Sequence, residues 1–450
     1  MERRRLVGIK KQGAGNTMKT NYILKNGRVI DPTRKMDRKM DVGISNGKIV
    51  QPTKAKDAVV IDLKGLVVAP GLIDMHVHLR QPGRTEKETI KTGTMAAAAG
   101  GFTKIVSMPN TTPPIDSTAT IELVNRIARD EGAVKVYPCA CISKNQEGKE
   151  MTSIGSLKKS GVIALSDDGK CIQNHELMRH VMEYSKSFGL PILDHCEDEK
   201  LGSGGVMHEG TWSVLLGLRG MPAASEEIMV SRDLILAEMI GCRLHIQHVS
   251  TAGSVRMIKD AQKRGVKVTA EVTPHHITLI DEEIKHFDTN YKMNPPLRSE
   301  AHRKALIAGL KDGTISVIAT DHAPHTETEK LVEFDYAPCG IIGLETAVPL
   351  CLTNLYHKKH LTLPALISKF TIGPAEILGL KTGLAEGTPA DITIIDPDLK
   401  HKVDASKFFS KSRNTPFDGC EVRGKALATV VDGVFVYSEL PEIQGTIANR

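Results

Sequence analysis

Two patterns of hydrophobic and polar positions alternate through the middle of the chain. Short apolar runs rich in β-branched residues recur eight times, and stretches of helical character stand between most of them. The runs predict buried parallel strands, and the stretches between them predict helices that cover those strands. The expected strands cover residues 71–78, 102–110, 134–142, 161–168, 190–196, 243–249, 266–274 and 314–322.

Eight strands alternating with helices predict an α/β protein built on a (β/α)8 TIM-type barrel. The alternating region spans roughly 250 residues, which is a usual size for such a barrel. A doubly wound open sheet is the alternative. No G-x-G-x-x-G motif follows an expected strand, which argues against the nucleotide-binding form of that fold.

The stretch TEKETIKTGTMAAAAGG, residues 85–101, is one of the expected helices. Thr85 and Glu88 stand three residues apart, which is the spacing of a capping box at a helix start. We therefore expect this helix to begin close to Thr85.

The two ends of the chain follow a third pattern, in which short apolar runs are separated by turn residues. The dipeptide Asn-Gly at 26–27 and again at 46–47 is a strong hairpin signal between such runs. Residues 390–398 and 426–438 repeat the pattern near the other end. The similarity of the two ends predicts one small β-sandwich assembled from both termini.

These patterns divide the chain into three expected parts. The barrel covers residues 69–380, and the composite β-sandwich domain covers 18–68 and 381–440. Residues 1–17 hold five Lys or Arg and one Glu, and Met18 opens a stretch that reads as a natural start. We therefore expect residues 1–17 to be a flexible N-terminal extension.

Composition excludes several classes of function. Apolar residues make up 40% and charged residues 25%, a profile typical of globular proteins. Aromatic residues are 4% with a single Trp, so stacking platforms for single-stranded nucleic acid are not expected. The net charge of +6 comes largely from residues 1–17, and the nearly neutral remainder argues against a general polyanion binder.

The cysteines and the hydropathy indicate the compartment. The eight cysteines are scattered without a C-x-x-C pair, which predicts reduced thiols in a cytoplasmic protein. No apolar run approaches the roughly 18–20 residues that a membrane span needs. We expect contact with neither a membrane nor a nucleic acid.

Polar residues stand at the ends of most expected strands. In a barrel of this class, the carboxyl ends of the strands converge on the active site. The side chains concerned are of the kinds that bind metals, move protons or bind substrates. In chain order they are His76, His78, Asn110, Asp167, Asp168, His195, His248, Asp321, His322 and His325.

The stretch IDMHVHLRQPG opens this series with His76 and His78. Side chains alternate along a strand, so these two imidazoles point to the same side and can grip one cation. Imidazole suits zinc and other borderline metals. Four histidines and two aspartates at matching strand ends exceed the needs of one catalytic zinc. They suit two metal ions about 3.5–4 Å apart with a bridging carboxylate.

Several motifs follow one another in a fixed order along the chain. They are DMHVHLRQPG, SMPNTTPPID, SDDG, DHCED, HVST, MNPPLRS and ATDHAPH…CGIIGLET. Together they resemble the class I dihydroorotases, cyclic amidohydrolases of the amidohydrolase superfamily, from about Met18 to near Tyr437. The resemblance implies zinc-dependent, reversible hydrolysis of (S)-dihydroorotate to N-carbamoyl-L-aspartate in de novo pyrimidine (UMP) biosynthesis.

The resemblance also implies a role for each matched residue. The implied ligands are His76, His78 and Asp321 for one Zn²⁺, His195 and His248 for a second, and Asp168 together with a hydroxide as bridges. Asp321 would also carry the proton during catalysis. The implied substrate contacts are His78, Arg80, Asn110, Asn294, His325, Cys339 and Gly340.

Two features separate this chain from the related hydantoinases, dihydropyrimidinases and allantoinases. Those enzymes usually bridge their metals with a carboxylated lysine at the end of strand four, where this chain reads ALSDDG. Lys170 is not expected to take that place, and the choice of Asp168 over Asp167 rests on the resemblance. Arg80 shares a face with His78 if the strand persists, and its guanidinium suits the carboxylate of dihydroorotate.

Other residues near the strand ends are expected to have lesser roles. His245 is expected to pack on the strand face opposite His248, and His275 and His276 are read as structural. His322 is expected to face away from Asp321, where it is open to a supporting role. The charged loop 326–340 is expected to be mobile without ligand.

The resemblance implies partners as well. Besides the small-molecule substrate, we expect a homodimer, and an association with aspartate transcarbamoylase is open. The alternatives to a dihydroorotase are another cyclic amidohydrolase and a non-catalytic transcarbamoylase partner. The second alternative is weakened because all six ligand positions are filled.

Overall fold

The computed structural model describes residues 20–443, so the predicted extension at 1–17 lies outside the described residues. Eight parallel strands form one sheet in which every neighbour along the chain is a neighbour in space. A parallel bridge from Val77 to His322 joins the last strand to the first and closes the barrel. The strands are β8 (Leu72–Val77), β9 (Phe102–Ser107), β10 (Lys135–Ala140), β11 (Ala164–Leu165), β12 (Ile192–Asp194), β15 (Leu244–Ile246), β16 (Val268–Val272) and β17 (Val317–Ile318).

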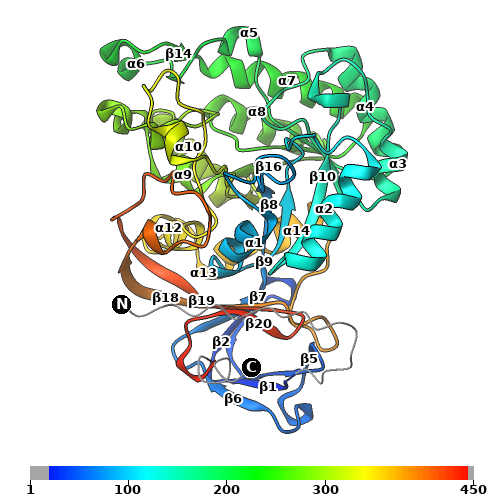
Figure 1. Cartoon of the computed structure of the whole chain (residues 1–450), viewed down its shortest axis with the longest axis vertical. Helices are drawn as coiled ribbons and strands as arrows, with labels where there is room; N and C mark the ends of the chain where they lie inside the picture. Colours follow the sequence, from blue (N-terminus) through cyan, green and yellow to red (C-terminus); the bar gives the residue numbers. More distant parts are fainter. Residues whose placement is uncertain (1–19, 444–450) are drawn as a thin grey trace.

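The predicted (β/α)8 barrel is confirmed, and the open sheet is wrong. Each observed strand lies inside its predicted run, and most of the polar residues that end those runs lie just beyond the strand. Helices surround the strands in the upper part of Figure 1. They are α1 (Ile90–Ala99), α2 (Thr118–Glu131), α3 (Ile154–Lys159), α4 (His175–Ser187), α5 (Glu199–Gly202), α6 (Thr211–Leu216), α7 (Ala223–Ile240), α8 (Ala252–Lys263), α9 (Pro274–Thr278), α10 (Glu300–Asp312), α11 (Glu327–Lys330), α12 (Ala347–Cys351), α13 (Leu363–Phe370) and α14 (Ile372–Leu378).

The start of α1 differs from the prediction. The helix begins at Ile90, where Thr89 and Thr92 form the reciprocal capping bonds. Glu88 is fully buried and instead accepts hydrogen bonds from the Ser410 hydroxyl at 2.5 Å and the Lys411 N–H. The expected capping box at Thr85 does not form, because the Glu88 carboxylate holds a distant segment of the chain.

Strands from both ends of the chain form a β-sandwich, as predicted, whereas β13 (Met207–His208) and β14 (Gly220–Met221) form a separate two-stranded sheet. Figure 1 shows the sandwich below the barrel. One sheet has the order β5-β4-β1-β6, and the other has the order β20-β19-β18-β7-β2-β3. The strands are β1 (Tyr22–Lys25), β2 (Arg28–Asp31), β3 (Met36–Lys39), β4 (Val42–Ser45), β5 (Lys48–Val50), β6 (Val59–Asp62), β7 (Val67–Pro70), β18 (Ile392–Lys402), β19 (Glu421–Val431) and β20 (Val434–Ser438). The exact domain boundaries stay a prediction.

The two Asn-Gly signals have different outcomes. Asn46-Gly47 joins the paired strands β4 and β5, so that hairpin is confirmed. Asn26-Gly27 joins β1 to β2, which lie in different sheets, so that hairpin is wrong. Asn26 has a φ of 61°, and its N–H donates to Asp41, which turns the chain from one sheet to the other.

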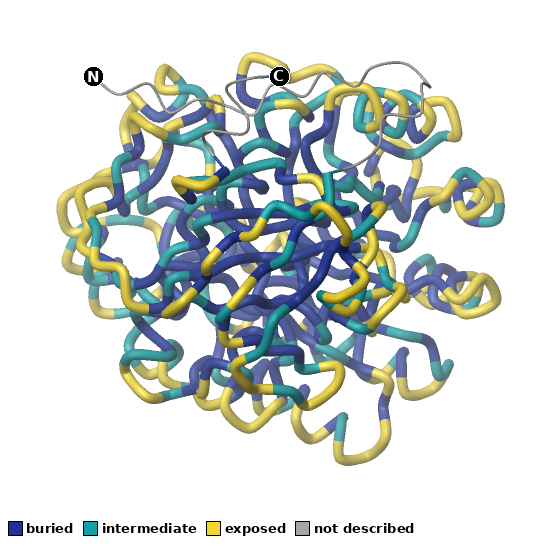
Figure 2. The backbone as a smooth tube through the Cα atoms, turned by 90° about the horizontal axis from the view of Figure 1, so that it is seen from below, coloured by how far each residue is buried: buried dark blue, intermediate teal, exposed yellow. Residues whose placement is uncertain are grey.

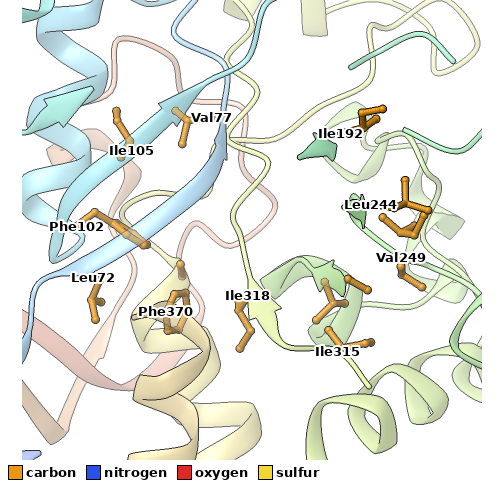
Figure 3. Close-up of a cluster of buried hydrophobic side chains, with 14 of the residues drawn as sticks. Leu72, Val77, Phe102, Ile105, Ile192, Leu244, Val249, Ile315, Ile318 and Phe370 are labelled. Atoms are coloured by element: carbon orange, nitrogen blue, oxygen red, sulfur yellow. The ribbon is translucent and has the colours of Figure 1, made fainter. Parts of the chain in front are cut away.

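Two layers of apolar side chains hold the barrel together. Residues such as Ile73, Met75 and Val317 fill its interior with side chains from α14, whereas the alternate positions pack against the surrounding helices. Figure 3 shows Leu72, Phe102 and Phe370, which belong to this outer layer. The ring centroids of Phe102 and Phe370 are 5.9 Å apart, and the rings pack edge-on. Figure 2 shows buried segments through the centre and exposed loops at the rim.

A buried ion-pair cluster joins the sandwich to the amino ends of the barrel strands. Asp391, just before β18, lies 2.6 Å from Lys104 Nζ of β9 and 2.9 Å from Lys135 Nζ of β10. Lys135 also pairs with Asp432 at 2.7 Å. Burial alone raises the pKa of Asp391, but the two lysines lower it below its usual value. The charge at this junction is therefore compensated.

Two further expectations concern the whole chain. All eight cysteines are free, as expected for reduced thiols. Among residues 20–443, no helix combines the length and the apolar character needed to cross a membrane.

Replacing Asp391 tests the junction. We expect Asp391→Ala to lower the free energy of unfolding by about 3–5 kcal/mol, because the buried Lys104 ammonium loses its partner and Lys135 keeps only Asp432. Urea unfolding followed by circular dichroism measures the change. Glu238→Ala, which removes the exposed pair with Arg264, is the control and is expected to leave the midpoint nearly unchanged. Equal midpoints for the two variants would contradict the role of Asp391.

Candidate active site

Six side chains of metal-ligating types converge at the carboxyl ends of the barrel strands. Two come from β8 and the residue that follows it, and the others come from the segments after β11, β12, β15 and β17. All six are buried. They are His76, His78, Asp168, His195, His248 and Asp321, the set that the resemblance implies.

The Asp168 carboxylate lies among the four imidazoles. Its Oδ1 is 3.3 Å from His76 Nε2 and 3.5 Å from His248 Nε2. The same oxygen is 3.8 Å from His195 Nδ1, whereas Oδ2 is 3.2 Å from His78 Nε2. Each of the four rings therefore presents one nitrogen to this single carboxylate.

The other carboxylate of the cluster lies to one side. Asp321 Oδ1 is 3.1 Å from His78 Nε2 and 3.4 Å from His76 Nε2. On the other side, His195 Nδ1 and His248 Nε2 are 2.8 Å apart. The six residues therefore form two groups that share Asp168.

The donor set fits divalent metal ions. His76 Nε2 and Asp168 Oδ1 are buried and form no hydrogen bond within the described residues. Buried polar atoms are normally satisfied, so this pair indicates a missing partner. An imidazole nitrogen and a carboxylate oxygen are both ligands that zinc accepts. His76 and Asp168 lie with His248 in one group of atoms close enough to bind a single ion, and His76, His78 and Asp321 form another.

The electrostatics of the cluster also favour a cation. Burial alone lowers the pKa of His76, but the carboxylates of Asp168 and Asp321 raise it well above its usual value. Burial alone raises the pKa of Asp168, yet His76 and its neighbours hold it well below its usual value. The carboxylates stay ionised, so positive charge is needed among them.

The outer nitrogens of three of the clustered histidines contact side chains from β16 and from the segments after β9 and β12. His76 Nδ1 is 2.6 Å from Glu271, His78 Nδ1 is 2.8 Å from Asn110 Oδ1, and His195 Nε2 is 3.0 Å from Glu197. These contacts fix the tautomer and orientation of each ring. Glu197 and Glu271 are not among the residues predicted from the sequence. A charged residue inside the buried run VTAEV of β16 was the available signal for Glu271.

Backbone geometry brings three of the site residues into place. Arg80, His248 and Asp321 have φ values of 57°, 29° and 48°, in the left-handed region that non-glycine residues seldom adopt. Such strain clusters at functional sites. It also means that simple strand alternation does not determine where these side chains point.

Arg80 lies beside the metal-ligand cluster, although β8 ends at Val77 and the expected strand continuation is wrong. Its Nε donates to the Pro324 carbonyl at 3.2 Å, and its Nη2 lies 3.5 Å from His325 Nε2. No carboxylate of residues 20–443 forms an ion pair with it. Burial lowers the pKa of Arg80 to about 10, so the group remains cationic at neutral pH. The Arg80 guanidinium is therefore available to bind an anionic group of a ligand.

Comparison with known proteins places the chain in a family. The family described as dihydro-orotase-like matches residues 65–254. A dihydroorotase of Pelotomaculum thermopropionicum is 51% identical over 421 residues, covering 93% of this chain and 98% of that protein. A dihydroorotase of Syntrophus aciditrophicus is 50% identical over 423 residues, covering 93% and 99%. The chain belongs to the dihydroorotase family. It is therefore an enzyme of the cyclic amide hydrolase class.

Solved structures of related enzymes share the fold. The L-hydantoinase (dihydropyrimidinase) of Arthrobacter aurescens is 26% identical with a TM-score of 0.84, covering 94% of this chain and 97% of that one. The dihydropyrimidinase of Brevibacillus agri is 23% identical with a TM-score of 0.82, covering 93% and 95%, and shows the fold alone. This chain therefore shares its architecture of a barrel with a β-sandwich with these two enzymes.

The neighbouring aspartates after β11 lie in different settings. Asp167 turns away from the cluster and accepts hydrogen bonds from the backbone N–H groups of Ile142 and Ser143. Lys170 donates to the Gln146 carbonyl at 3.1 Å, outside the ligand cluster. Asp168 is the carboxylate that reaches the histidines.

The remaining polar candidates lie in several different settings. Asn294 Nδ2 donates to Glu197 at 2.6 Å, and its Oδ1 forms no hydrogen bond within the described residues. His325 Nε2 donates to the Cys339 carbonyl at 2.9 Å. Gly340 packs so closely on Ala323 that a Cβ would lie 2.7 Å from the alanine methyl. Arg80, His325 and the Cys339 backbone are therefore brought together, and their role in substrate binding stays a prediction.

The histidines expected to have lesser roles are buried. His322 faces Glu88 and accepts from the Gly343 N–H, so it points away from Asp321 as expected. His276 is 2.9 Å from the Pro295 carbonyl, whereas His275 Nε2 forms no hydrogen bond in the described part of the chain. The reading of His245 as a packing residue is wrong, because its ring hydrogen-bonds to Glu271 in the barrel interior.

The loop 326–340 is held by buried lysines. Lys330 Nζ donates to the carbonyls of Thr289 and Pro338 at 3.0 and 2.7 Å. Lys292 Nζ donates to the carbonyls of Phe334 and Asp335 at 2.8 and 2.9 Å. The loop is therefore hydrogen-bonded to its surroundings, and its mobility without ligand stays a prediction.

Asn414 is a further residue that the sequence analysis missed. It lies in the connection between β18 and β19, and its Nδ2 donates to the carbonyls of Ala323 and Gly340 at 3.0 Å each. Its Oδ1 accepts from the His325 N–H at 3.0 Å. A segment far along the chain thus holds together the two backbone stretches beside Asp321.

Replacing Asn414 tests this clamp. We expect Asn414→Ala to lower stability by about 1–3 kcal/mol for each buried group left unpaired, and to lower kcat/KM because His325 and Gly340 lose their fixed positions. Asn354→Ala is the matched control, since Asn354 is a buried asparagine bonded to Thr278 and Leu350. We expect the control to lose stability alone. Thermal unfolding and steady-state kinetics separate the two effects, and unchanged kinetics in Asn414→Ala would contradict the clamp.

Proposed function

We propose that this enzyme is a zinc-dependent dihydroorotase that interconverts (S)-dihydroorotate and N-carbamoyl-L-aspartate in de novo pyrimidine biosynthesis. The observation that carries the proposal is the single carboxylate of Asp168 within 3.2–3.8 Å of four histidine nitrogens. Relatives about half identical over nearly the whole chain bear the name dihydroorotase. Dimerisation and a transcarbamoylase partner stay predictions.

The six clustered residues would hold two zinc ions. His76, His78 and Asp321 form one ligand group, and His195 with His248 form the other. Asp168 lies between the two groups, with Oδ1 facing both and Oδ2 facing His78, and would bridge them. When bound, such a metal pair makes water acidic enough to attack at neutral pH and polarises the carbonyl under attack.

Asp321 would move the proton. Ring opening needs a base to accept a proton from the attacking water and an acid to deliver it to the departing ring nitrogen. Burial alone raises the pKa of Asp321, but His76 and His78 lower it far below its usual value, so the carboxylate starts ionised. Its Oδ1 lies 3.1 Å from His78 Nε2. In the reverse direction the same carboxylate returns the proton and the ring closes.

Arg80 would select the substrate by its carboxylate. Dihydroorotate carries an anionic group on a cyclic ureide, and a planar guanidinium can bind that group through two parallel hydrogen bonds. Among residues 20–443, no acidic side chain forms an ion pair with Arg80, although Asp321 and Asp168 are near enough to raise its pKa. His325, Asn294 and the backbone at Cys339 and Gly340 would complete the contacts to the ring, and Asn110 would act on the substrate beside His78.

A hydantoinase or dihydropyrimidinase activity is the second candidate, because structures of those enzymes share the fold. Their substrates are neutral rings with no partner for a buried guanidinium. Lys170 also lies outside the ligand cluster and donates to a backbone carbonyl. Both observations favour the acidic substrate.

Hydrolysis assays test the proposed activity. The zinc-loaded chain is assayed with L-dihydroorotate, dihydrouracil, hydantoin and allantoin in one preparation. We expect turnover of dihydroorotate alone. Preferred turnover of a neutral ring would contradict the role of Arg80 while keeping the metal centre.

Replacing Arg80 tests the selection of the carboxylate. We expect Arg80→Gln to raise KM for dihydroorotate roughly 10- to 100-fold, the effect of losing a charge-assisted hydrogen-bonded pair. Arg84→Gln removes a nearby exposed arginine and is the control, with KM unchanged. Initial-rate kinetics in both directions measure the effect. An unchanged KM in Arg80→Gln would remove it from the binding site.

Replacing Asp321 tests the proton transfer. We expect Asp321→Asn to lower kcat by about 10²- to 10⁴-fold, because the amide cannot accept the proton. Metal content measured on the same samples distinguishes loss of chemistry from loss of zinc. A variant that keeps both metals and turns over within tenfold of the parent chain would contradict this role.

A further inference from the structure

One buried acid of the barrel interior has no part in the proposed chemistry. Glu271 lies on β16 and is inaccessible to solvent. Its Oε1 accepts from His76 Nδ1 at 2.6 Å and from the His248 N–H at 3.3 Å. Its Oε2 lies 3.1 Å from His245 Nε2. A single carboxylate therefore contacts two of the six clustered residues, each on a different strand segment.

The other side of this carboxylate is also fixed. His245 Nδ1 lies 2.8 Å from the Thr269 hydroxyl, and Thr269 stands two residues before Glu271 on the same face of β16. A continuous line of hydrogen bonds therefore runs from Thr269 on β16 to His245 on β15, back to Glu271 on β16, and on to His76 on β8. The line ends at the ring nitrogen of His76 that faces away from Asp168.

We propose that Glu271, supported by His245 and Thr269, is a positioning residue of the metal centre, an inference that rests on the proposed function. Its charge holds the proton of His76 on Nδ1, so that Nε2 presents its lone pair to the metal. The same oxygen holds the His248 N–H where the backbone adopts its φ of 29°. Glu271 thus orients one ligand from each of the two ligand groups.

A purely structural role does not explain a carboxylate here. Placing an ionised group in a water-free interior is costly, and an uncharged glutamine could accept the same two hydrogen bonds at lower cost. The negative charge has a use if it makes His76 a stronger ligand. Partners of this kind behind metal-bound histidines typically strengthen metal binding 10- to 100-fold.

Metal affinity separates the two explanations. Metal-free parent chain and Glu271→Gln are titrated with Zn²⁺ against a chromophoric chelator, and the cobalt-loaded forms are compared by visible absorption. We expect Glu271→Gln to bind Zn²⁺ 10- to 100-fold more weakly and to shift the cobalt bands. Asp391→Asn is the matched control, because it neutralises a buried ionised carboxylate at the opposite end of the barrel. We expect its zinc affinity to equal that of the parent.

A second variant guards against misfolding of the first. Thr269→Val removes the hydroxyl behind His245 without touching a ligand, and we expect a smaller loss of zinc affinity in the same direction. Parent-like affinity in both Glu271→Gln and Thr269→Val, or an equal loss in Asp391→Asn, would overturn the inference. Failure of the parent chain to bind Zn²⁺ would instead overturn the proposed metal centre itself.

Discussion

The structure depends on one buried carboxylate that faces four imidazoles. Asp168 has no solvent to stabilise its charge, and its Oδ1 has no hydrogen-bond donor among the described residues. Metal cations bound between the carboxylate and the rings, as proposed above, would compensate this buried charge. The arrangement of the carboxylate and the rings requires strands β8, β11, β12 and β15 to end at one level, which the barrel ensures. The barrel therefore brings the ends of these strands, and the side chains that follow them, close together.

The parts of the chain outside the barrel contribute to the same centre. Glu88 binds the segment at Ser410, and Asn414 from that segment holds the backbone beside Asp321. At the opposite end of the barrel, Asp391 ties the sandwich to β9 and β10. The sandwich strands from both termini thus anchor a connection that reaches over to the site. The position of His325 therefore depends on contacts with a segment far along the chain.

The sequence predicted those features that depend on local pattern. Eight β-branched runs predicted eight strands, and ligating residues at their ends predicted the convergence of His195 and His248 with Asp168. Local spacing failed where distant residues decided the outcome. Glu88 is bound by Ser410 and not by Thr85, and Asn26 turns between sheets because of Asp41. The partners of Glu271 and Asn414, such as His76 and Ala323, are far from them in sequence, so strand alternation alone does not reveal their contacts. The positive φ of Arg80 and Asp321 likewise has no signature in strand alternation.

Anomalous X-ray diffraction at the zinc edge, from crystals of the zinc-loaded chain, tests the central claim most directly. The account requires two peaks about 3.5–4 Å apart, one on each side of Asp168, with His76, His78 and Asp321 around one and His195 and His248 around the other. A single peak, or a second peak away from Asp168, would contradict a two-metal centre bridged by this carboxylate.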